Sequence, residues 1–189
     1  ADVDWAVPIS LGDSHRGYRV IGTTQDYFTA YKYGQAQTLR VQDGEIFEDI
    51  FDAVIGASVA RELGYEIGTP LILTHGLGQA GFADHDNRPF KVVGILAPTG
   101  TPVDRSIHIP LEGITAIHVG WETGAPNPLA EQFTEDMIRG FDLTPKTVTA
   151  VFIGLKNRAT VLRTRRAINT RSAEPLQAIM PALALAELW

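Results

Sequence analysis

The stretch from Asp52 to His118 constrains the fold most, because it alternates short apolar segments with turns that contain glycine or proline. Segments of this length, rich in branched and aromatic residues and bounded by turns, are typical of β-strands. A short helix is expected from Ser58, since Val59 and Leu63 lie one turn apart and Gly64 stands where a left-handed C-cap is common. The pattern predicts a small β-rich module with strands at 53–55, 71–73, 90–96 and 107–109, and a second helix at 111–119.

The flanking segments add further strands and helices. A β-hairpin is expected at the N-terminal side, where segments 5–9 and 18–22 enclose a glycine-bearing turn. On the C-terminal side a strand, a helix and a last strand are expected at 147–155, 158–168 and 176–180, with Asn157 as the helix cap. A further helix at 129–138 follows a proline- and glycine-rich connector. Together these elements predict an α+β fold with two subdomains.

Composition excludes several classes of protein. The chain has 189 residues, of which 44% are hydrophobic, which is enough for one ordinary domain or two small ones. A net charge of −6 argues against a nucleic-acid-binding protein, which normally carries a basic surface. The absence of cysteine rules out disulfides and thiolate metal sites. No apolar run reaches the roughly 18 to 20 residues that would span a bilayer.

Three patterns resemble catalytic or nucleotide-binding motifs but are incomplete. Gly76–Gly81 fits G-x-G-x-x-G, yet the residues after it break helices, so the helix that would meet a pyrophosphate is missing. Gly56–Ala60 lacks the second glycine of a nucleophile elbow. Asp13, Ser14 and His15 are adjacent in sequence, which does not suit a catalytic triad. The chain has no Walker A pattern, so we expect no enzymatic activity of its own.

Four histidines suggest a metal site. His75 and His85 have the same spacing as His108 and His118, and Asp84 and Asp86 flank His85. Imidazole and carboxylate groups together suit zinc, although neither spacing is a compact ligand pair. The alternative is that these histidines are hydrogen-bonded surface groups. Zinc titration by calorimetry would distinguish the two.

A second concentration of charge lies near the C-terminal end. Six of the sixteen basic residues fall between Lys156 and Arg171, around the expected helix. A basic helix face can meet anionic lipid or an acidic partner, and it can also be a simple solvated face.

The order of the elements and three phrases resemble one family. VIGASVARELG at 54–64, FKVVGIL at 90–96 and IHIPLEG at 107–113 are similar to the periplasmic core domain of MacB/FtsX-type ABC-transporter permeases. The resemblance implies a non-enzymatic domain on the periplasmic side of the bacterial inner membrane, in a permease served by a separate cytoplasmic ATPase subunit. It would bind a periplasmic protein, or a lipophilic or peptide substrate, and couple ATP hydrolysis to conformational change, with a homodimer in the full transporter.

The resemblance also implies a division of the chain. A porter-like subdomain would comprise residues 1–51 and 145–189, an inserted β-rich subdomain residues 52–120, and a connector residues 121–144. Two other classes of function remain open at this point. One is a soluble metal-binding or chaperone-like domain that uses the histidines, and the other is a small hydrolase.

Overall fold

The structure is a computed structural model that describes residues 2–75, 88–120, 132–173 and 175–180. The chain divides into two compact units. Unit 1 comprises residues 1–6 and 153–189, and unit 2 comprises residues 7–152. The subdomain boundaries expected from the sequence remain a prediction.

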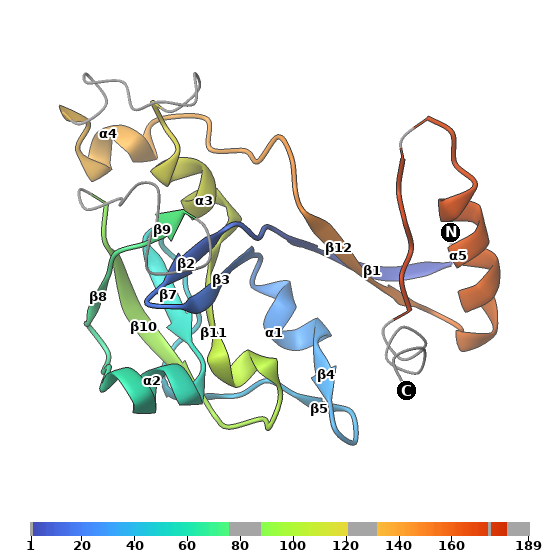
Figure 1. The fold of residues 1–189 in the computed structure, drawn as a ribbon, viewed down its shortest axis with the longest axis horizontal. Helices are drawn as coiled ribbons and strands as arrows, with labels where there is room; N and C mark the ends of the chain where they lie inside the picture. The colour runs from blue at the N-terminus through green and yellow to red at the C-terminus, as the bar shows by residue number, and fades with distance from the viewer. Residues whose placement is uncertain (1, 76–87, 121–131, 174, 181–189) are drawn as a thin grey trace. The chain divides into compact units, whose positions relative to one another are not determined.

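Unit 2 contains an eight-stranded mixed sheet among its described residues (Figure 1). The strand order is β6-β10-β7-β11-β3-β2-β9, and β8 pairs with β10 beside this path. Parallel pairs (β10 with β7, β11 with β3) are combined with antiparallel ones (β11 with β7). The strands are β2 (Asp13–His15), β3 (Tyr18–Thr23), β6 (Val41–Gly44), β7 (Asp52–Ile55), β8 (Pro70–Leu71), β9 (Thr74–His75), β10 (Phe90–Leu96) and β11 (Ser106–Pro110).

Short helices cover the ends of the sheet. Strands β7 and β11 are antiparallel and each is followed at once by a helix, so α2 and α3 lie at opposite ends of these strands (Figure 1). Gly64 ends α2 in the left-handed conformation, with φ of 67°, as the sequence predicted. The remaining elements of unit 2 are α1 (Asp26–Ala30), β4 (Lys32–Tyr33), β5 (Gln37–Thr38), α2 (Ala57–Leu63), the 3-10 helix η1 (Pro102–Arg105), α3 (Leu111–Ile117) and α4 (Glu135–Arg139).

The core of unit 2 lies between the central strands and these helices. Alternate residues of β10 are buried, as the period of a strand requires when one face packs inward. All five residues of β11 are buried, so this strand is covered on both faces. The core side chains come mainly from the stretch 52–118. They include Ala53, Ile55, Val59, Leu71, Phe90, Val92, Ile107, Ile109 and Ile117.

Unit 1 contains the helix α5 (Val161–Asn169), the 3-10 helix η3 (Arg158–Thr160) and parts of two strands. The strands are β1 (Val3–Ile9) and β12 (Ala150–Leu155), which pair as a two-stranded sheet. Asn157 caps η3 by accepting a hydrogen bond from the Ala159 amide, as predicted. Unlike unit 2, the described residues of unit 1 contain no buried side chain.

Several local predictions were wrong. Segment 5–9 does not form a hairpin with 18–22: β1 pairs with β12, and only an isolated bridge joins Ser10 to Gly22. The expected turn contains β2. No strand forms over 175–180, where Leu176 and Ile179 are exposed and no neighbouring strand pairs with them. The helix near 129–138 begins only at Glu135, capped by Thr134, and residues 129–131 lie outside the described residues.

Candidate functional site

His108 is the most enclosed of the histidines proposed as metal ligands. It lies in the middle of β11 and is fully buried. Its ring centroid is 5.1 Å from that of Tyr27 and 5.7 Å from that of Phe28, both on α1. Nδ1 lies 3.3 Å from the Val54 carbonyl, which can only accept, so Nδ1 carries the proton. Burial lowers the pKa of His108 to about 4, which keeps the ring neutral.

The other three histidines are in different surroundings. His118 is the C-cap of α3, half-buried, and its Nδ1 donates to the Ile114 carbonyl at 2.6 Å. His75 ends β9, and His85 lies outside the described residues. In the parts of the chain that the structure describes, no three histidine or acidic side chains are placed to hold a metal ion. The four-histidine zinc site therefore remains a hypothesis.

His15, which was expected in a turn, is buried in β2, and both of its ring nitrogens form hydrogen bonds. Its Nδ1 donates to the Ile72 carbonyl at 2.6 Å, and its Nε2 accepts from the Tyr65 hydroxyl at 2.8 Å. Burial lowers the pKa of His15, and the bond to Ile72 offsets this in part. The ring therefore holds β2 against the segment before β9.

Two arginines connect elements of unit 2. Arg88 is buried, and its Nη1 donates to the carbonyls of Ala116, Ile117 and Val119 at 2.8 to 3.0 Å, which satisfies the C-terminal end of α3. Arg105 is exposed and donates to both carboxylate oxygens of Glu62 at 2.9 Å. Neither arrangement was foreseen, because each depends on residues far apart in sequence.

Exposed apolar side chains occur on β12. Val151 and Phe152 in unit 2 are 49% and 43% exposed, and Ile153 in unit 1 is 38% exposed. Since consecutive residues of a strand point to opposite faces, both faces of this strand expose apolar surface. The ring of Phe152 stacks on Tyr27, with centroids 6.4 Å apart. One side of this exposed ring therefore packs against the buried Tyr27.

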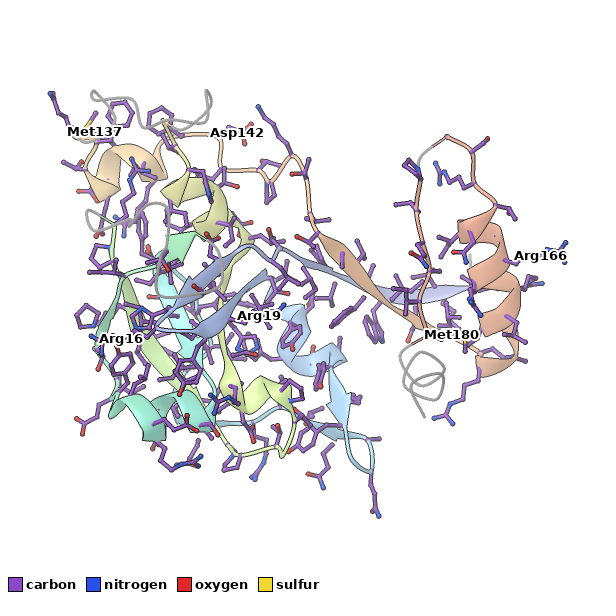
Figure 2. All side chains as sticks on the ribbon, viewed as in Figure 1. Arg16, Arg19, Met137, Asp142, Arg166 and Met180 are labelled. Carbon is purple, nitrogen blue, oxygen red and sulfur yellow. The ribbon has the colours of Figure 1, made fainter. Side chains whose placement is uncertain are left out.

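Basic side chains gather on α5. Arg165 and Arg166 are exposed, and Arg166 extends away from the helix in Figure 2. Arg163 forms an ion pair with Asp2 within unit 1. No helix in the described part of the chain is long and apolar enough to cross a membrane. Gly76–Gly81, the pattern similar to a nucleotide-binding loop, lies outside the described residues.

The fold and these surfaces define an α+β domain with a mixed sheet. The model of the MacB-like periplasmic core domain matches residues 1–171, and the chain therefore belongs to this family, the periplasmic domain of ABC-transporter permeases. This confirms the resemblance noted in the sequence. The family is a transporter domain and is not a known enzyme family.

One solved structure that is similar to this chain has low sequence identity to it. A domain assigned to a permease protein from Porphyromonas gingivalis is 10% identical, with a TM-score of 0.45. The match covers 98% of this chain and 83% of that one. No curated protein matches the chain.

Proposed function

We propose that this domain binds a periplasmic partner or substrate and couples cytoplasmic ATP hydrolysis to conformational change outside the membrane, in efflux or in mechanotransmission. In this proposal, the full permease holds the domain at the outer face of the bacterial inner membrane. ATP is hydrolysed by a separate cytoplasmic subunit. Membership in the family of MacB-like periplasmic core domains supports this assignment.

The observation that carries the proposal is the way the chain connects its two units. The chain passes from unit 1 to unit 2 between Ala6 and Val7, and returns between Phe152 and Ile153. Both passages lie inside strands, β1 and β12, which pair with each other. A two-stranded ribbon is marginally stable without further support. Such a connection allows one unit to change position while each unit keeps its own structure.

The exposed apolar residues of β12 support a binding role. Val151 and Phe152 point to opposite faces of the strand, so each face offers exposed apolar surface of the kind that binding sites use. Val151 and Phe152 would suit a lipophilic or peptide substrate, or an apolar segment of a periplasmic protein. A second copy of the permease in a homodimer is the further partner that the family suggests.

Coupling is testable with introduced thiols: these 189 residues contain no cysteine, and cysteines elsewhere in the permease or its ATPase would first be replaced. We would place spin labels at Gln35→Cys in unit 2 and Ser172→Cys in unit 1, both exposed positions. In the full permease, in nanodiscs, with its ATPase, the distance distribution between these labels is expected to change between the nucleotide-free and vanadate-trapped states. Pulsed electron–electron double resonance measures that distribution.

A matched pair within unit 2 provides the control. Gln35→Cys and Glu66→Cys are both exposed, and we expect the same distance in the two states. The proposal fails if the distance distribution between the labels at positions 35 and 172 does not change in a permease that hydrolyses ATP normally. Hydrolysis would then not be coupled to movement of this domain.

A further inference from the structure

The outer face of α5 combines positive charge with an exposed leucine. Leu162 is 67% exposed, and Arg165, Arg166 and Asn169 follow it at intervals of three, four and seven residues, so they share its side of the helix. These four residues and Thr170 line a shallow hollow. The opposite side of the helix carries the partly buried Val161, Thr164 and Ile168.

The segment 156–171, which includes α5, is positively charged, whereas the chain as a whole is negatively charged. Residues 156–171 contain six basic residues and no acidic ones, whereas the chain as a whole has a net charge of −6. Arg163 is paired with Asp2, but Arg165 and Arg166 form no ion pair with any described residue. The two guanidinium groups of the outer face are therefore available to an anion.

The helix also lacks the burial that normally stabilises a helix of its length. It has nine residues, and none of them is buried. Helices shorter than about 12 residues are marginal in water and owe their stability to packing of one face. On the outer face, Asn169 Oδ1 accepts a hydrogen bond from the Ala178 amide of unit 1. A surface that covered Leu162, Arg165 and Arg166 would add further contacts to the helix.

From these observations we propose that the outer face of α5 binds the surface of a bilayer that contains anionic phospholipids. The forked guanidinium groups of Arg165 and Arg166 would contact lipid phosphates, with the side-chain NH2 of Asn169 as a further donor. Leu162 would enter the boundary between headgroups and acyl chains, as apolar residues of interfacial helices do. Interfacial helices show this combination of basic residues and an exposed leucine.

A bilayer suits this face better than an acidic protein does. Residues 1–6 and 153–180 belong to unit 1 together with α5, and in the proposed function the permease holds this domain at the outer face of the inner membrane. This step rests on the membrane attachment in the proposed function. Attachment also raises the local concentration of lipid around unit 1, so a weak contact is enough.

Vesicle sedimentation tests the proposal directly. The chain is mixed at low salt with vesicles of phosphatidylcholine alone, or of phosphatidylcholine with phosphatidylglycerol. We expect binding only to the anionic vesicles, lost at high salt, and weakened by more than about 30-fold by Arg165→Glu/Arg166→Glu. The matched control is Arg19→Glu/Arg40→Glu, two exposed arginines of unit 2 with the same change of charge, which should retain binding except for a small general loss.

Further variants separate the outcomes. If charge reversal unfolds unit 1, as seen by circular dichroism, Arg165→Gln/Arg166→Gln replaces it, and Leu162→Ser tests the apolar contact. Equal binding to neutral vesicles, or an equal loss in the two double variants, would overturn the proposal. Absence of vesicle binding together with Arg165-dependent binding of polyglutamate would assign the face to an acidic protein instead. The spin-label experiment on coupling is independent of all these results.

Discussion

Arg139 and Asp49 form a two-point ion pair between α4 and the acidic segment before β7. Arg139 Nη2 lies 3.0 Å from Asp49 Oδ1, and Nε lies 3.1 Å from Oδ2, although the residues are 90 positions apart. The guanidinium also lies over the ring of Phe51, 5.3 Å from its centroid. The bond from Arg139 lowers the pKa of Asp49 below its ordinary range. This pair therefore fixes α4 to the core.

Removal of this pair should have a modest, measurable effect on stability. Both side chains are about two-fifths exposed, so we expect a coupling energy of about 0.5 to 1 kcal/mol in a double-mutant cycle with Arg139→Ala and Asp49→Ala. Because the folded-state pKa of Asp49 is lowered, its contribution is present above about pH 4 and is lost as the pH falls further. Urea unfolding at pH 7 and pH 3 measures both effects. Additive single-variant effects would contradict the coupling.

Buried His108 should make the protein less stable in mild acid. Its pKa in the folded state is about 4, against about 6.5 in an unfolded chain, so the unfolded state binds a proton first as the pH falls. The folded state is therefore favoured most above pH 6.5. Between pH 7 and 4.5 we expect the free energy of unfolding to drop by roughly 2 to 3 kcal/mol on account of this residue.

The variant His108→Leu isolates that contribution. Leucine fits the contact with Tyr27 and Phe28 and cannot titrate. Nε2 of His108 has no hydrogen-bond partner among the described residues, so its removal leaves no group unpaired, whereas the Val54 carbonyl loses the long bond from Nδ1. Unfolding curves at several pH values should show a shallower pH dependence in the variant. The remaining slope belongs to carboxylates and to His15, whose pKa is also lowered. An unchanged slope would show that His108 does not titrate as described.

Gly113 should not tolerate alanine, although it lies inside a helix. By helix propensity alone, glycine to alanine in α3 would stabilise the helix by about 1 kcal/mol. In the structure, however, a Cβ on Gly113 would overlap the backbone carbonyl of Ile50 and would lie 2.9 Å from the Phe90 ring. We expect Gly113→Ala to destabilise the protein by about 1 to 3 kcal/mol. Gly140→Ala, where a Cβ meets only the Met137 carbonyl at 3.2 Å, serves as the milder control for thermal unfolding.

The zinc hypothesis makes a prediction of its own. If His75, His85, His108 and His118 bind zinc, calorimetry should show one zinc ion per chain, lost in the variant His75→Ala/His85→Ala. Because the four-histidine site includes His108, His108→Leu should weaken zinc binding too, although this ring is buried against Tyr27 and Phe28. The absence of stoichiometric binding would end the hypothesis.

Much of the fold could be predicted because it depends on local signals. The apolar segment 90–96, bounded by turns, identified β10, and the spacing of Val59 and Leu63 with Gly64 identified α2. Asn157 identified the start of η3 by its capping chemistry. The phrases around these elements also carried the family resemblance, which the match over residues 1–171 confirmed.

The failures lie where structure depends on distant parts of the chain. An apolar strand does not specify its neighbour, so β1 was assigned to the nearest strand in sequence, whereas it pairs with β12, some 140 residues later. Segment 176–180 has the composition of a strand but pairs with no other strand in the described part of the chain. Likewise the environment of His108 follows from α1 packing on β11, which no spacing of histidines reveals.

By itself, then, the sequence determined most of the short strands and helices of 52–118 and the helix caps Gly64 and Asn157. It also determined the family and the concentration of positive charge at 156–171. Each of these properties depends on residues that are close together in the sequence. Only the tertiary structure decided which strands pair, that His108 is buried and neutral, and that Arg165 and Arg166 share an exposed face with Leu162. These properties depend on which residues meet in space, and hydrophobic burial and hydrogen bonding choose those partners across the whole chain.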